Sequence, residues 1–163
     1  MRTAWVVAAL VVGCGGTRGA DRPAPELLRL TLRESAASIE KSFGPHSHSA
    51  RGGGYSVLEF GADSSEHNDL GFEWTFYFEQ PSGELLSVTH NLPEARNVDA
   101  LFPASESRKH HGGGVSALSR PLPGDRVLIA IGVVERGSGC SQLILMRRSV
   151  VERFYPWIAE GLK

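Results

Sequence analysis

The strongest constraint on the fold is a run of strict alternation between residues 72 and 78. Aromatic side chains occupy every second position, with polar or amphipathic ones between them: Phe72, Trp74, Phe76 and Phe78 against Glu73, Thr75 and Tyr77. This pattern indicates a strand with one buried and one wet face, as in antiparallel sheets. Pro81-Ser82-Gly83 predicts a turn, after which residues 84–90 return as an antiparallel partner.

A helix is predicted before these strands. Thr31 and Glu34 form a Thr-x-x-Glu capping box, and Gly44-Pro45 supplies the end. Between them, apolar side chains share one face at helical spacing: Leu32, Ala36, Ile39 and Phe43. The His-, Ser- and Gly-rich residues 45–54 predict a loop, and residues 55–60 a further strand.

The second half of the chain repeats much of this order. Phe43-Gly44-Pro45 and Gly52-Gly53-Gly54-Tyr55 align with Leu101-Phe102-Pro103 and Gly112-Gly113-Gly114-Val115. A short helix is predicted at 97–102, and the apolar residues 127–134 and 143–146 predict strands inside the sheet. Chance is the alternative explanation, because the chain contains 19 glycines.

The C-terminus predicts another helix. Ser149 and Glu152 form a second capping box, and Pro156 predicts that the helix kinks or restarts there. Together the patterns predict an α+β fold: an antiparallel sheet of about six strands with an N-terminal and a C-terminal helix. Two helix-plus-three-strand pseudo-repeats, at 26–92 and 93–163, are a further hypothesis.

The N-terminus carries an export pattern. The apolar run from Ala4 to Val12 is too short for a bilayer, which takes about 20 apolar residues, but suits a signal peptide. Val11-Val12-Gly13-Cys14 resembles the lipobox of bacterial lipoproteins. The resemblance implies that residues 1–13 are a signal peptide and that Cys14 receives acyl chains such as palmitate. An ordinary secretory signal with an incidental cysteine, or a buried strand, are the alternatives.

The same resemblance places the protein in the cell envelope. Residue 15 is Gly instead of the Asp that retains many lipoproteins at the inner membrane, so we expect the outer membrane, facing the periplasm. Residues 14–25 predict a flexible lipidated tether with a reach of roughly 20 Å, and residues 26–163 a single domain. Cys140 is then the remaining free cysteine, and we expect a buried or idle thiol instead of a reactive one.

Composition argues against one class of partner. The 17 Lys and Arg residues nearly balance the 18 Asp and Glu residues, and no basic stripe is present. Because nucleic-acid binding needs clustered positive charge, no nucleic-acid partner is expected.

Histidines are the most suggestive polar residues. His46 and His48, with His110 and His111, can supply imidazole nitrogens to a transition metal such as zinc, copper or nickel. Since the two pairs lie at equivalent places in the pseudo-repeat, all four could converge on one ion. The alternative is solvated loop histidines and no cofactor. His67 and His90 are interpreted as structural.

A hydrolase is a third reading. His111-Gly112-Gly113-Gly114 resembles the oxyanion-hole motif of lipases and esterases, but the chain has no Gly-x-Ser-x-Gly nucleophile elbow. Ser56 or Ser116 beside a histidine would be the candidate nucleophiles.

The order of helix, Gly-Pro stop and antiparallel strands on a lipid anchor resembles the small outer-membrane-assembly lipoproteins and the related fold of the β-lactamase inhibitor protein. The resemblance rests on residues 31–34, 39–45 and the strands through His90. It implies a non-catalytic protein-binding or assembly module in the periplasm, with an envelope protein as partner. A periplasmic metal-binding protein and a small hydrolase are the alternative functions.

Overall fold

A continuous antiparallel sheet organises the chain. The structure, a computed structural model, describes residues 25–63, 72–112, 114–132 and 140–163. In this part of the chain eight strands pair in the order β1-β2-β3-β4-β8-β7-β6-β5. Their bounds are β1 His48–Gly52, β2 Tyr55–Asp63, β3 Phe72–Glu79, β4 Leu85–Arg96, β5 Arg108–Gly112, β6 Val115–Leu122, β7 Arg126–Ile131 and β8 Cys140–Arg147.

The two halves of the sheet have the same connectivity. Strands β1 to β4 form one meander and β5 to β8 another, and the two are joined where β4 pairs with β8 in the centre. In both halves the first hairpin closes at the glycine triplet, with Gly52 opposite Tyr55 and Gly112 opposite Val115. The prediction of six strands, three per half, was wrong, because residues 45–54 and the corresponding segment after Pro103 are not all loop and include the edge strands β1 and β5.

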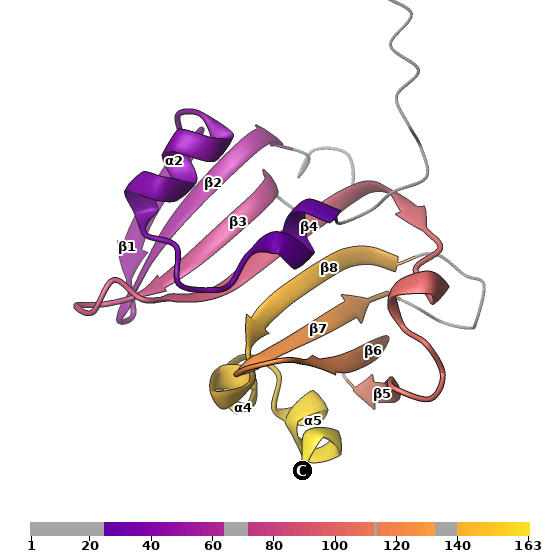
Figure 1. Ribbon diagram of the computed structural model, residues 1–163. Coiled ribbons are helices and arrows are strands. Elements are labelled where there is room, and N and C mark those ends of the chain that lie inside the picture. Colours follow the sequence, from indigo (N-terminus) through magenta and orange to yellow (C-terminus); the bar gives the residue numbers. More distant parts are fainter. Residues whose placement is uncertain (1–24, 64–71, 113, 133–139) are drawn as a thin grey trace, which may run out of the picture.

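Helices cover the sheet unevenly. The short helices α1 (Pro25–Arg29) and α2 (Ala36–Phe43) lie against one face, which we call the front face (Figure 1). The C-terminal segments η2 (Arg148–Val150), α4 (Val151–Phe154), α5 (Pro156–Ala159) and η3 (Glu160–Leu162) pack on the other side, the back face, over the half that contains β6 and β7.

Two hydrophobic cores result. The front core packs the aromatic side chains of β3 against α2, where Phe43 makes edge-on contacts with Trp74 at 5.3 Å and Phe76 at 5.0 Å between ring centroids. The back core packs Ile129 and Ile144 of the sheet against Ile158 of α5. Strands β7 and β8 therefore bury both faces, as their apolar sequences predicted, and they occupy the interior of the sheet.

The predicted N-terminal helix is wrong in its extent. Thr31 and Glu34 do interact, since the Glu34 carboxylate accepts hydrogen bonds from the Thr31 backbone N–H at 2.8 Å and from its hydroxyl. However, Leu32 has φ 62°, which no helix allows, and α2 begins only after the N-cap Ser35. Its predicted end is confirmed: Gly44 caps α2 with φ 89°, a conformation that glycine adopts without strain.

The second capping box does not start a helix as predicted. Ser149 instead bonds Asp125 in the β6–β7 turn, through its backbone N–H at 3.0 Å and through its hydroxyl. The predicted break at Pro156 is confirmed, because α4 ends at Phe154 and Pro156 is the first residue of α5. The predicted short helix at 97–102 is the 3-10 turn η1 (Asp99–Leu101).

Candidate functional site

The histidines proposed as metal ligands lie at opposite edges of the sheet. His46 and His48 are at the β1 edge, and His110 and His111 are in β5 at the other edge. With adjacent strands about 4.8 Å apart, roughly 30 Å separates the two pairs. Zinc binds imidazole nitrogen at about 2.0–2.1 Å, so the four side chains of one chain cannot share one ion.

Each of the four histidines has a different partner. His46 Nδ1 lies 2.6 Å from a Glu40 carboxylate oxygen, and His48 Nδ1 lies 2.8 Å from one of Glu59. The β5 pair points to opposite faces because successive residues of a strand alternate. Within the described residues, no group of three or more His, Cys, Asp or Glu side chains could hold a metal ion.

The β5 histidines each contact a serine of β6. His110 is buried, and its Nε2 lies 2.7 Å from Ser119 Oγ. Burial lowers the pKa of His110, and the nearby positive charge of Arg108 lowers it further. His111 Nδ1 lies 2.9 Å from Ser116 Oγ, and this pair is exposed.

The two cysteines and the two remaining histidines form no shared metal site among the described residues. Cys140 is completely buried at the start of β8, and burial raises the pKa of its thiol to about 12. His90 stacks on Trp74 with 3.8 Å between ring centroids. Cys14 and His67 lie outside the described residues.

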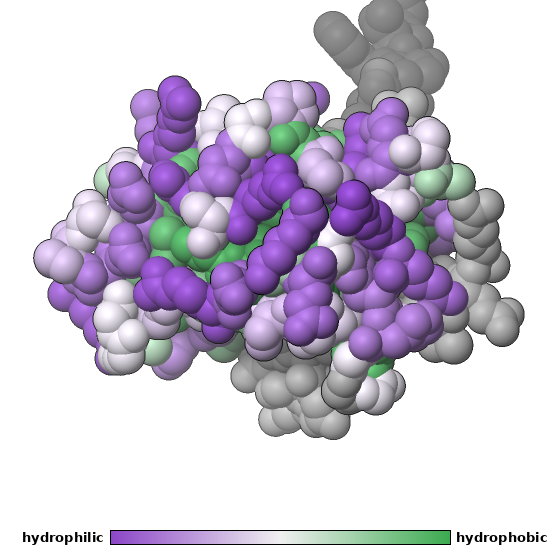
Figure 2. All heavy atoms as spheres, turned by 90° about the horizontal axis from the view of Figure 1, so that it is seen from below, coloured by the Kyte–Doolittle hydropathy of each residue, from purple (hydrophilic) through white to green (hydrophobic). Residues whose placement is uncertain are grey.

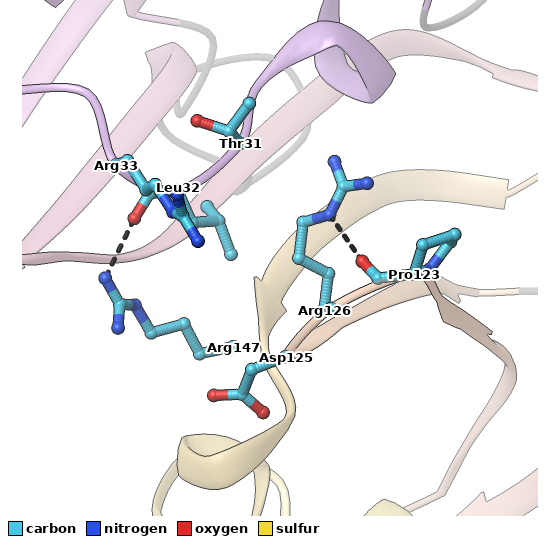
Figure 3. Close-up of a pocket in the computed structure, with 8 residues that line it drawn as sticks. Thr31, Leu32, Arg33, Pro123, Asp125, Arg126 and Arg147 are labelled. Atoms are coloured by element: carbon cyan, nitrogen blue, oxygen red, sulfur yellow. Dashed lines mark hydrogen bonds between the residues drawn. The ribbon is translucent and has the colours of Figure 1, made fainter.

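A cleft rich in arginine lies where the linker between α1 and α2 meets the β6–β7 turn (Figure 3). Its volume is about 320 Å³. Arg147 donates hydrogen bonds to the carbonyls of Leu85 at 3.0 Å and Leu32 at 2.9 Å. Arg126 donates to the Leu30 carbonyl at 2.8 Å. These two arginines therefore hold the linker, including the strained Leu32, against the sheet.

Charge around this cleft is balanced. Arg147 pairs with Glu84 at 3.4 Å, and Asp125 and Glu34 also line the cleft or its extension toward the β3–β4 turn. The Glu34 carboxylate is itself held by local hydrogen bonds; burial raises its pKa, but bonds from Thr31 and Arg33 outweigh this and leave it lowered. We therefore interpret the cleft as a structural clamp without preference for an anion.

A second concavity lies on the back face and, unlike the arginine-rich cleft, is lined mainly by neutral polar side chains. The β-ladder register aligns Glu59, Thr75 and Thr89 in one cross-strand row of β2, β3 and β4. Tyr77 and Ser87 form part of the next row. Phe154 at the end of α4 packs against Tyr55 of β2 and Tyr77 of β3 and, with Tyr155, forms one wall over this half of the back face. We call the concavity the back-face pocket; its volume is about 220 Å³, and it is lined by Glu59, Thr75, Tyr77, Ser87, Thr89, Asn91, Gln142, Met146, Phe154 and Tyr155.

Hydroxyl side chains form much of the lining of the back-face pocket. Thr75 is 6 % exposed and Ser87 is 3 % exposed, so their side chains lie at the bottom of the pocket. Buried polar groups are normally satisfied by protein, water or ligand. The pocket therefore offers hydroxyl groups to which water or a polar ligand can hydrogen-bond.

Two phenols at the pocket stay protonated. Burial raises the pKa of Tyr77, and the neighbouring Glu59 carboxylate raises it further. Burial also raises the pKa of Tyr155 to about 12, with a smaller contribution from Tyr77. Both hydroxyls consequently remain neutral hydrogen-bond donors and acceptors across the physiological pH range.

Sequence reasoning missed this pocket. It treated Thr75 and Tyr77 as the wet face of a strand, whereas Thr75 is buried. The available signal was that β3 and β4 place neutral hydroxyl side chains on the face opposite the aromatic one.

Few large hydrophobic side chains are well exposed among the described residues. Among these residues, Val115 is the large hydrophobic one that is well exposed, at 44 %. Viewed from below, hydrophilic atoms surround a narrower strip of hydrophobic ones (Figure 2).

Comparison with known protein families, characterised proteins and solved structures found no match to this chain. The expected resemblance to outer-membrane-assembly lipoproteins gains no support from these comparisons. None of the helices in the described part of the chain has the length and apolar character needed to cross a bilayer.

Proposed function

We propose that this protein is a lipid-anchored, non-catalytic binding module of the cell envelope that contacts its partner with the half of the back face that carries the back-face pocket. The lipobox-like sequence ending at Cys14 supports the anchor and an outer-membrane location facing the periplasm. The tether of residues 14–25 would keep the sheet within roughly 20 Å of the bilayer.

The polar pocket on the back face supports the proposal that the protein is a binding module. The same face of one sheet is apolar and covered over β6 and β7, whereas over β2 to β4 it carries a polar pocket with Phe154 of α4 as one wall. A sheet face that merely needed solvation would leave its hydroxyls exposed, whereas Thr75 and Ser87 lie at the bottom of a pocket. Such convergent polar groups in a concavity are the usual mark of a binding site.

Two measurements in a bacterium with two membranes test the proposal. The full chain should incorporate labelled palmitate and fractionate with the outer membrane, while Cys14→Ser should do neither. A photo-cross-linking residue at position 89, in the pocket, should yield adducts in intact envelopes that the same residue at Ser105, an exposed turn position, does not. Failure to label would overturn the anchor, and equal cross-linking at both positions would overturn the binding face.

A small hydrolase is the second candidate, favoured by the contact of 2.9 Å between Ser116 Oγ and His111 Nδ1. This is the distance at which a histidine can act as the base for a serine nucleophile. The ion pairs between histidine and carboxylate among the described residues involve His46, His48 and His90, not His111. A fluorophosphonate probe decides between the functions: labelling that is lost in Ser116→Ala would favour the hydrolase, and no labelling would exclude this serine as a nucleophile.

A further inference from the structure

We propose that the back-face pocket binds a neutral, hydroxyl-rich ring, of the chemical class of a pyranose sugar in an envelope glycan. The inference rests on the proposed function, because it names the ligand of the same face. It departs from the protein partner that the sequence led us to expect.

The lining favours a neutral ligand. No lysine, arginine or histidine is among the described residues that line the pocket, so a phosphate or carboxylate would be desolvated without a balancing charge. The one ionisable carboxylate, Glu59, already has one oxygen 2.8 Å from His48 Nδ1. An ammonium group would therefore compete with an existing partner.

Hydrogen-bonding capacity favours a ligand with several hydroxyls. Five hydroxyl side chains line the pocket, and each can both donate and accept: Thr75, Tyr77, Ser87, Thr89 and Tyr155. Two amides beside them are held in place, since Gln142 Nε2 donates to Asn91 Oδ1 at 2.9 Å and Asn91 Nδ2 donates to the Phe72 carbonyl at 2.6 Å. Sugar hydroxyls have the same dual character, and the site is organised before a ligand arrives.

Aromatic side chains and size favour a ring. Phe154 and Tyr155 line the pocket from the C-terminal helices, and Tyr77 lines it from the sheet. Tyr77 and Phe154 pack edge-on, with 6.1 Å between their ring centroids, so the aromatic wall of the pocket links the sheet to α4. At about 220 Å³ the pocket is smaller than sites for drug-sized molecules, which start at about 300 Å³. One ring fits, and the rest of a glycan would continue outside.

Calorimetric titration of the full lipidated chain tests the inference. The chain is kept in a zwitterionic detergent without a sugar headgroup, and the probes are chitobiose and maltose, with inorganic phosphate and ethylammonium as charged comparisons. The variants are Thr75→Val and Ser87→Ala, which each remove one buried hydroxyl, and the matched control is Ser105→Ala in an exposed turn. Circular dichroism checks that all variants fold.

The expected result is saturable binding of at least one disaccharide, weakened roughly 3- to 10-fold by each pocket variant and unchanged by Ser105→Ala. No binding by either disaccharide would overturn the inference, as would binding that the pocket variants leave intact or a preference for phosphate or ethylammonium. Cross-linking from position 89 to a protein alone, without sugar binding, would leave the proposed function standing and replace its ligand.

Discussion

Two glycines at equivalent hairpin positions differ sharply in their surroundings. A Cβ atom added at Gly112 would meet the Trp157 ring at 2.8 Å, whereas one added at Gly52 would meet nothing within 4 Å. We expect Gly112→Ala to lower the free energy of unfolding by about 1–3 kcal/mol, because the indole must move out of the back core. Gly52→Ala should change it by less than about 0.5 kcal/mol. Urea unfolding of both variants measures the difference, and equal effects would contradict the packing of α5 on β5.

Cys140 should not react while the protein is folded. Its thiol is fully buried, and a pKa of about 12 leaves almost no thiolate at neutral pH. Iodoacetamide at pH 8 should therefore leave the peptide containing Cys140 unmodified in the native chain and modify it completely in urea. Mass spectrometry of that peptide reads the outcome independently of Cys14. Rapid native labelling would show that β8 begins elsewhere.

His110 should make stability depend on pH in a defined direction. Its pKa is lowered in the folded protein, so below about pH 6.5 the unfolded chain binds the proton more readily. Stability linked to this residue is complete above that pH and is lost as the pH falls. Urea unfolding between pH 7.5 and 5.5 should show a steeper loss for the natural chain than for His110→Gln. Identical slopes would contradict the buried neutral imidazole.

Among the elements of the fold, the linker between α1 and α2 is held in place by a hydrogen bond from Arg147. Arg147 bonds the carbonyls of Leu32 and Leu85, and loss of its guanidinium leaves both partly buried acceptors unpaired. We expect Arg147→Met to cost about 2–3 kcal/mol. Hydrogen exchange should show faster amide exchange at residues 30–35. Arg153→Met, which removes an exposed cation, serves as the control and should leave exchange at the linker unchanged.

The same linker shows why a local motif misled the sequence analysis. The Thr31–Glu34 interaction forms, but tertiary contacts decide the backbone: Leu32 is 1 % exposed, and burying it requires the left-handed φ of 62°. A capping box specifies only that a carboxylate meets backbone N–H groups, which a tight turn also permits. The helix end at Gly44 was predictable because glycine conformation is a stronger local requirement.

The edge strands β1 and β5 were missed for a related reason. All five residues of β1 are exposed, so no alternation of hydrophobic side chains marks it. The usable signal was the turn: Gly53 and Gly54 both have positive φ, 59° and 84°, as a two-residue hairpin requires. A Gly-Gly pair before a strand predicts a preceding partner strand even when that partner is polar. Strands with a buried face could be predicted from the sequence because burial requires apolar side chains at regular positions.

Over the whole molecule, the two halves share connectivity but use the back face differently. The second half covers it with α4 and α5, and the first leaves the back-face pocket. The sequence could predict an α+β fold and an antiparallel sheet, since these follow from periodicity. It could not predict the pocket or separate the histidine pairs, because both depend on which strands become neighbours and which become edges.

The back face carries an open polar pocket in its first half, whereas the C-terminal helices cover its second half. Thr89 and Ser119 lie in one cross-strand row, the first in the back-face pocket and the second fully buried beside His110. Cysteine at each position, in the Cys140→Ser background, can be titrated with a small methanethiosulfonate reagent. We predict rapid modification at position 89 and none at position 119 until the chain is unfolded. Protection at both positions, or equal reactivity, would contradict the account.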